Sequence, residues 1–73
     1  MLKEKILKNQ VRAHRFNNGE MTQEDLAQQV GASRQTIIAI EKGNYNPSVT
    51  LALEMARVFR VPVEKIFSLE EKS

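Results

Sequence analysis

Cysteine is missing from this chain of 73 residues, so neither disulfides nor thiolate metal ligands can stabilise its fold. Glycine and proline are scarce, and the sequence shows no low-complexity segment and no internal repeat. No apolar run approaches the roughly 18 residues that cross a membrane. The start, MLKEKILKNQ, is charged and lacks the apolar segment of a secretory signal. These absences predict one small cytoplasmic domain over residues 1–73, stabilised by helix packing, by dimerisation or by both.

Candidate catalytic and metal-binding groups are equally few. His14 is the only histidine, and no carboxylates stand near it at ligand spacing. We expect this histidine to face solvent, with a contact to a phosphate group as the alternative. No nucleophile–base pair, metal motif or phosphate loop is present, and a short helical chain has little room for a pocket. The sequence therefore predicts no enzyme activity, no metal, no cofactor and no small-molecule ligand.

Basic residues are unevenly spread along the chain, although the net charge is only +2. Lys3, Lys5, Lys8, Arg12 and Arg15 crowd the first segment, where only one acidic residue opposes them. The part that follows Asn46 carries equal numbers of acidic and basic residues. This distribution fits an anionic partner at one end of the molecule, and a solvated basic helix is the alternative.

Glycine and proline divide the chain into five expected helices. Gly19, Gly31 and Gly43 each lie at a break in the helical periodicity. The expected helical segments are residues 2–16, 22–30, 34–42, 48–59 and 62–67, followed by a frayed tail over residues 68–73. No apolar–polar alternation of four residues has turn signals on both sides, so the sequence predicts an all-α fold with its core within residues 6–67.

The core is expected from apolar residues that recur at helical spacing. The inner positions of the three middle helices are Leu26, Ala27, Val30, Ile37, Ile40, Leu51, Ala52, Met55, Ala56 and Phe59. Phe16 and Met21 are also expected in the core.

The second and third helices are joined by Gly31-Ala32 and little else. Gly31 can adopt a left-handed conformation and turn the chain sharply. Thr22-Gln23-Glu24-Asp25 resembles a capping box at the start of the second helix, and Ser33 is a suitable N-cap for the third. Two helices joined this tightly form a helix-turn-helix unit, whose second helix can lie in the major groove of DNA.

The third helix restarts with polar side chains that no core requires. Arg34, Ile38 and Lys42 share one face at four-residue spacing, flanked by Gln35 and Ala39. Arginine can form a two-pronged bond with guanine, glutamine can do so with adenine, and an exposed β-branched residue suits the methyl group of thymine. A solvated polar face is the alternative, but the short glycine turn and the capped helix before it favour a DNA-reading surface.

These features resemble the phage repressor/Cro, or XRE, family of helix-turn-helix regulators, and more narrowly its small stand-alone bacterial and archaeal members. The matching runs are MTQEDLAQQVGASRQTIIAIEKGNYNPS and LALEMARVFRVPVEKIF. Together they span roughly residues 11–67. The resemblance implies a five-helix DNA-binding domain that regulates transcription.

The resemblance also implies roles for individual residues. Gln23 matches a glutamine that bonds a phosphate and braces the first residue of the recognition helix, here Arg34. The residues expected to read bases are Arg34, Gln35, Ile38 and Ala39. Those expected on the DNA backbone are Gln23, Ser33, Thr36, Lys42, Asn44, Tyr45 and Asn46, with packing of its ring over the loop as a further role for the tyrosine.

Arg15 matches a family arginine that pairs with a glutamate at the end of the third helix, here Glu41. This implies a partly buried ion pair, and a plain phosphate contact by the arginine is the alternative or an addition. Arg60 departs from the family pattern, because a helix-ending glycine often stands there. A positive φ at this position would cost on the order of 1 kcal/mol.

Members of this family usually bind DNA as two-fold dimers on inverted half-sites about 34 Å apart. The candidates for a dimer interface are apolar residues left over in the C-terminal half: Leu53, Val58, Val63, Phe67 and Leu69. The tail over residues 68–73 would then become ordered in that interface. In the alternative, Val63 and Phe67 merely close the core.

The sequence thus predicts a repressor of transcription that binds double-stranded DNA and a second copy of itself. An antitoxin-like module that holds a protein partner is the alternative, and the near absence of an added helix or long tail counts against it.

Overall fold

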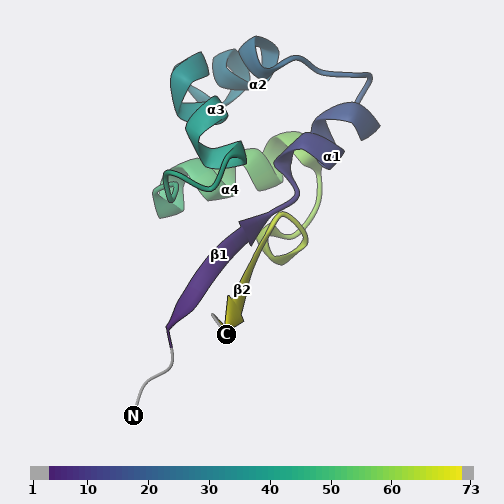
Figure 1. The fold of residues 1–73 in the computed structure, drawn as a ribbon. Helices are drawn as coiled ribbons and strands as arrows, with labels where there is room; N and C mark the ends of the chain where they lie inside the picture. The colour runs from purple at the N-terminus through teal and green to yellow at the C-terminus, as the bar shows by residue number, and fades with distance from the viewer. Residues whose placement is uncertain (1–3, 72–73) are drawn as a thin grey trace.

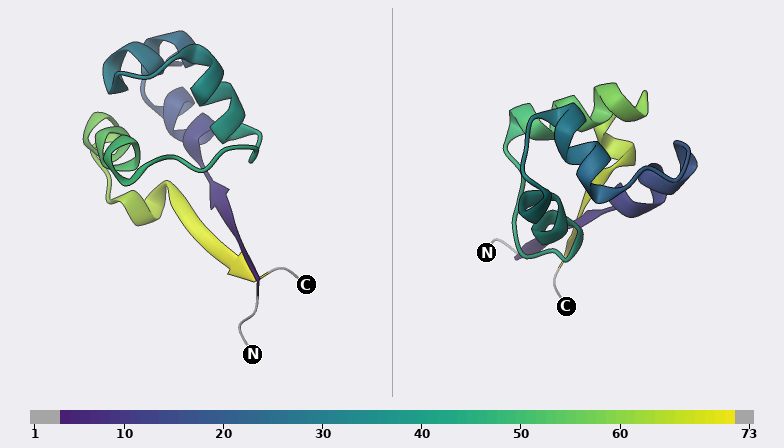
Figure 2. Two further views of the ribbon diagram at one scale, coloured as in Figure 1. Left: turned by 90° about the vertical axis from the view of Figure 1, so that its left-hand side faces the viewer. Right: turned by 90° about the horizontal axis from the view of Figure 1, so that it is seen from above.

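The computed structural model describes residues 4–71, which form four α-helices, a short 3-10 helix and a two-stranded antiparallel sheet. The helices gather at one end of the molecule, and the two strands extend away from them as a ribbon (Figure 1). The left view of Figure 2 shows the same separation of helices and ribbon. The fold is therefore mostly helical, but it is neither purely all-α nor built from five α-helices.

The prediction of a first helix over residues 2–16 is wrong for the first half of that segment. Strand β1 spans Lys5–Asn9, and helix α1 spans only Val11–Asn17. The Asn9 side chain ends the strand, because its carboxamide oxygen accepts the Val11 N–H at 3.2 Å and its nitrogen donates to the Ile40 carbonyl at 3.0 Å. Leu2, the first apolar residue of the expected helix, lies outside the described residues.

The C-terminal end also differs from the prediction. The expected helix over residues 62–67 is reduced to a 3-10 turn, η1, at Val63–Lys65. The expected frayed tail is strand β2, Phe67–Glu71, which pairs with β1 so that Leu7 faces Leu69 and Lys5 faces Glu71. The two segments are far apart in sequence, and each is too short for its periodicity to separate helix from strand.

The three middle helices agree with their predicted positions: α2 at Gln23–Val30, α3 at Arg34–Glu41 and α4 at Val49–Phe59. Helix α4 ends at Arg60, which adopts a left-handed conformation with φ 59° and ψ 42°. This is the positive φ whose cost the sequence analysis considered for an arginine in place of a helix-ending glycine. Because Arg60 carries a Cβ atom, this conformation is strained relative to glycine.

One apolar core joins the helices to the base of the ribbon. Leu26 and Ile37 are fully buried, as are Met55 of α4 and Val11 of α1. Within residues 4–71, the buried apolar residues are Val11, Leu26, Ala27, Val30, Ile37, Ile40, Met55, Phe59 and Ile66. Ile66, from the segment between η1 and β2, was not expected in the core.

Two of the side-chain predictions near α1 are wrong. Phe16 is 47% exposed, and its ring lies 5.3 and 5.4 Å from the guanidinium carbons of Arg12 and Arg15. His14 is half-buried, because its ring stacks on Phe59 at 5.3 Å and its Nε2 donates to the Lys65 carbonyl at 3.1 Å. The short α1 turns this histidine towards the core and leaves the phenylalanine between two arginines, where cation–π contacts hold it.

Candidate nucleic-acid interface

Local interactions set the angle between α2 and α3. Thr22 and Asp25 form a reciprocal capping box, with the Asp25 N–H donating to the threonine hydroxyl at 2.9 Å and the Thr22 N–H donating to the carboxylate at 3.1 Å. Gly31 ends α2 in the left-handed region with φ 73°. The chain then needs only Ala32 and Ser33 before α3 begins, so the two helices meet in a tight turn.

Helix α3 presents opposite properties on its two sides. Ile37 and Ile40 are buried in the core, while Arg34 and Gln35 are exposed in the first turn. Ile38 and Ala39 are half-buried, and Lys42, which follows the last helical residue, is exposed. The side of α3 that faces away from the core therefore carries a guanidinium, a carboxamide and an ammonium group, with small apolar surface between them.

Ser33 and Thr36 are engaged with each other at the start of α3. The Ser33 hydroxyl oxygen accepts the Thr36 N–H at 3.1 Å, and the two side-chain oxygens lie 2.9 Å apart. Ser33 therefore acts as the N-cap of the recognition helix. Each hydroxyl can still meet a phosphate, because a hydroxyl has one donor and two acceptor sites.

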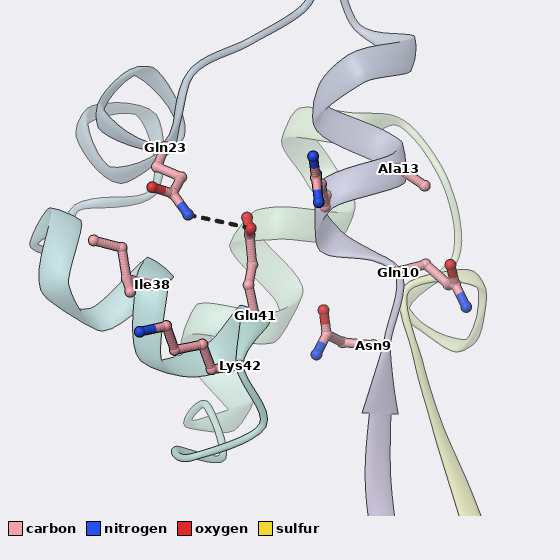
Figure 3. A pocket seen from close by; sticks show the side chains of 8 residues that line it. Asn9, Gln10, Ala13, Gln23, Ile38, Glu41 and Lys42 are labelled. Atoms are coloured by element: carbon pink, nitrogen blue, oxygen red, sulfur yellow. Dashed lines mark hydrogen bonds between the residues drawn. The ribbon is translucent and has the colours of Figure 1, made fainter.

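Gln23, Arg15 and Glu41 form one network at the junction of three helices. Figure 3 shows the part of it that joins Gln23 to Glu41. Both carboxylate oxygens of Glu41 accept bonds from Arg15, at 2.7 Å from Nε and 3.0 Å from Nη2. Gln23 Nε2 donates to Glu41 at 3.2 Å. A carboxamide nitrogen has two donors, so the second N–H of Gln23 remains able to meet a phosphate while the first is held.

This network borders an open hollow of about 290 Å³ between the start of α1, the start of α2 and the end of α3. Figure 3 shows Gln23, Ile38 and Lys42 on one side of it and Asn9 and Gln10 across from them. Arg12 also lines the hollow. We did not assign this arginine to the site from the sequence, and only its place in the basic N-terminal cluster could have indicated it.

The turn between α3 and α4 exposes the remaining expected backbone contacts, Asn44, Tyr45 and Asn46. The Asn44 N–H donates to the Ala39 carbonyl at 2.9 Å, which ties the start of this turn to α3. The turn is therefore held next to the C-terminal end of α3.

The residues expected at a dimer interface fall into two groups. Val58 and Phe67 pack against the core, and Val63 is half-buried. Leu53 on α4 is 55% exposed and Leu69 on β2 is 65% exposed. Val49, one turn before Leu53, is also exposed and is not among the residues that the sequence analysis proposes for an interface.

Other kinds of site are not seen in the described part of the chain. Between residues 4 and 71, no group of three or more histidine and acidic side chains is placed to hold a metal ion. Within the same residues, no helix is both long and apolar enough to cross a membrane.

The helix-turn-helix geometry is matched by the comparisons with known proteins. The sequence model of the helix-turn-helix family matches residues 16–66, from the end of α1 to the base of the ribbon. The chain belongs to this family, in its Cro/C1, or XRE, type, whose members are transcription regulators and not enzymes. The function that follows is that of an HTH-type, DNA-binding transcription regulator.

Relatives occur in archaea and in bacteria. An HTH-type transcriptional regulator of Methanocaldococcus jannaschii is 51% identical over 65 residues, which cover 89% of this chain and 97% of the relative. YgzD, an HTH-type transcriptional regulator of Bacillus subtilis, is 45% identical over 67 residues, covering 92% and 100% of the two chains. The chain therefore matches these small regulators over nearly their whole length.

Solved structures share the fold. A crystal structure from Bacteroides fragilis superposes with a TM-score of 0.74 at 21% identity, covering 86% of this chain and 100% of the other. The transcription factor NHTF from Neisseria superposes with a TM-score of 0.68 at 31% identity, covering 75% of this chain and 62% of that protein.

Proposed function

We propose that this regulator recognises specific double-stranded DNA sequences with α3 in the major groove, as a homodimer on inverted half-sites in the cytoplasm. The observation that carries the proposal is the exposure of Arg34 and Gln35 in the first turn of α3, opposite the buried Ile37 and Ile40. Residues near the N-terminus of a recognition helix are the ones that reach base edges.

The chemistry of these side chains supports base reading. Arg34 can donate two bonds to O6 and N7 of guanine, and Gln35 can bond N6 and N7 of adenine. Ile38 and Ala39 offer apolar surface to a thymine methyl group. Since a good bidentate pair discriminates against the wrong base by about 1–3 kcal/mol, two such residues can define a short half-site.

The surrounding groups support contacts with phosphates. Gln23 is held by Glu41 with one N–H unused, and Lys42 and Arg12 flank the same hollow. Ser33, Thr36 and the exposed turn with Asn44, Tyr45 and Asn46 extend this surface along α3. Phosphate contacts of this kind position the protein on the duplex and supply most of the sequence-independent affinity.

We further propose that the protein represses transcription by occupying promoter DNA. A half-site read by one α3 is short, and a single small domain buries too little surface to bind tightly at physiological salt. Two copies on inverted half-sites double the recognised sequence and the number of phosphate contacts. Leu53 and Leu69 are the exposed members of the candidate dimer residues.

Selection of bound duplexes from a random DNA pool tests this function. We expect enrichment of an inverted repeat whose half-site centres lie about one helical turn, 34 Å, apart. Enrichment of a single unrepeated motif would contradict binding as a dimer but would still support sequence-specific recognition. Absence of any enriched motif would contradict sequence-specific binding itself. Placing the selected site over a promoter and measuring transcription in vitro then tests repression, which predicts reduced transcript as protein is added.

A further inference from the structure

The ribbon of β1 and β2 extends beyond the helices and has two outer edges (Figure 1). A strand at the edge of a sheet presents backbone N–H and C=O groups that can pair with another strand. A two-stranded ribbon alone is also only marginally stable in water. Because these strands reach beyond the core that would support them, a third strand is the natural way to stabilise them.

One face of the ribbon carries apolar side chains outside the core. In the antiparallel pairing Leu7 lies opposite Leu69, and Asn9 lies opposite Phe67. Opposite residues share a face, so these four side chains lie on one face, which we call the leucine face. Phe67 packs against the core, but Leu69, two residues further along, is 65% exposed.

We propose that β2 pairs antiparallel with β2 of a second copy of this chain, giving a four-stranded sheet in the order β1-β2-β2-β1. This proposal rests on the proposed function in one respect: it names the surface through which the homodimer forms. We infer that the partner strand belongs to a second copy of this chain, because β2 can pair with its own copy. A two-fold interface requires such self-complementarity.

Symmetry restricts the register of such a pair. A two-fold axis between antiparallel strands places one residue opposite its own copy. With Leu69 at the centre, all five residues of each strand are paired, Ser68 lies opposite Glu70 of the partner, and Phe67 lies opposite Glu71 of the partner. A centre at Glu70 would place like charges directly opposite each other, which is destabilising. A centre at Ser68 would leave the end of each strand unpaired.

The Leu69 register also gives a complementary pattern of side chains. On the leucine face, Leu7 and Leu69 of each copy form one row of four leucines across the sheet. On the other face, Lys8 lies opposite Ser68 in its own ribbon, and Ser68 lies opposite Glu70 of the partner. Lys8 and Glu70 of the partner thus lie two strands apart in one row, with Ser68 between them, and no two like charges are directly opposed.

The outer edge of β1 is less suitable for a partner. Residues 6–9 of that strand border a hollow whose other wall is formed by Glu41, Lys42 and Gly43, so an added strand would meet the end of α3. Both Figure 1 and the left view of Figure 2 place β1 on the α3 side of the ribbon and β2 on the far side. The edge of β2 is therefore the accessible one.

Pairing through β2 is compatible with binding to one duplex. Asn9, on the leucine face, donates to the Ile40 carbonyl of α3. The two-fold axis of an antiparallel pair is perpendicular to the sheet, so the leucine faces of both copies lie on the same side. Both recognition helices consequently lie on the same side of the sheet, as two half-sites on one face of DNA require.

Single cysteines test the interface directly, because the natural chain has none. In Leu69→Cys, two thiols lie opposite each other at the two-fold axis, within the Cα separation that a disulfide tolerates. We expect most of this variant to form a covalent dimer in a glutathione redox buffer, read on a non-reducing gel. The matched controls are Leu53→Cys on α4 and Leu7→Cys on β1, which we expect to give little covalent dimer on the same gel while circular dichroism shows that each is folded.

The outcome of the cysteine experiment is decisive in either direction. Cross-linking of Leu53→Cys in place of Leu69→Cys would move the interface to α4 and overturn the proposal. Cross-linking of Leu7→Cys alone would move it to β1. No excess cross-linking of Leu69→Cys, with or without duplex DNA, would also overturn it. The readout needs no sequence-specific binding, so failure of DNA recognition and failure of this interface are separate results.

Ser68 provides a second test in which local and intermolecular effects have opposite signs. In Ser68→Glu the new carboxylate faces Lys8 within the ribbon, which is favourable, but faces Glu70 of the partner, which is unfavourable. We expect sedimentation equilibrium to show a dimer dissociation constant raised about tenfold, because two symmetric contacts are affected. Ser68→Lys should lower it. Tighter association of Ser68→Glu than of Ser68→Lys would contradict the pairing.

Discussion

Glu41, at the end of α3, accepts hydrogen bonds from Arg15 of α1 through both carboxylate oxygens, at 2.7 and 3.0 Å. The two side chains are only 8% and 11% exposed. Arg15 also donates to the Met21 carbonyl at 2.8 Å, so one guanidinium joins α1, the turn before α2 and the end of α3. The recognition helix is thus anchored at its C-terminal end by a nearly buried ion pair.

The buried pair predicts a large loss of stability when one partner is removed. Arg15→Met leaves the Glu41 carboxylate without its cation, and we expect the free energy of unfolding to fall by about 3 kcal/mol. The double variant Arg15→Met with Glu41→Leu should recover much of that loss, because no buried charge remains. Urea denaturation of the single and double variants measures this, and a double variant less stable than Arg15→Met would contradict it.

Replacing Gln23 and replacing Lys42 are expected to change DNA affinity in different ways. Gln23→Ala removes a neutral phosphate donor, so affinity should fall for specific and scrambled duplexes alike while the salt dependence is unchanged. Lys42→Ala removes a cation, so the slope of log K against log salt should decrease by about 1. Fluorescence anisotropy at several salt concentrations measures both. Identical slopes for Lys42→Ala and the natural protein would contradict a phosphate contact by that lysine.

The left-handed backbone at Arg60 predicts that a glycine at this position stabilises the protein. Its φ of 59° is disfavoured for a residue with a Cβ atom by about 1–2 kcal/mol. After allowance for the greater freedom of glycine in the unfolded chain, Arg60→Gly should gain about 1 kcal/mol and raise Tm by about 4–8 °C. The control Arg57→Gly, inside α4, should lose about 1 kcal/mol. A lower Tm for Arg60→Gly than for the natural protein would contradict the strain.

Local sequence signals were sufficient for the centre of this fold. The Thr22 capping box, the Ser33 N-cap and the left-handed Gly31 act within one or two turns of the chain, so the residues themselves define the boundaries of α2 and α3. The apolar spacing of α2–α4 then identifies the inner faces. The exposed polar start of α3 follows from the same pattern. When Ile37 and Ile40 face the core, the residues on the opposite side of the helix face solvent.

The parts that could not be predicted depend on contacts between distant residues. Strand β1 forms because β2 pairs with it from the other end of the chain. Its five residues, of which Lys5 and Lys8 are charged, are too few to show a clear periodicity. His14 turns inward because Phe59 and Lys65 arrive beside it from later segments. Arg12 joins the hollow beside Gln23 only through the placement of the short α1, which the expected long helix obscured.

The base-reading role of α3 is the central claim, and one comparison tests it most directly. Affinities for the selected duplex and for a scrambled duplex are measured for the natural protein and for the variant Arg34→Ala with Gln35→Ala. We expect the variant to stay folded, since both side chains are exposed, and its preference for the selected duplex to fall by at least about tenfold. A double variant that keeps both the affinity and the sequence preference of the natural protein would contradict this account.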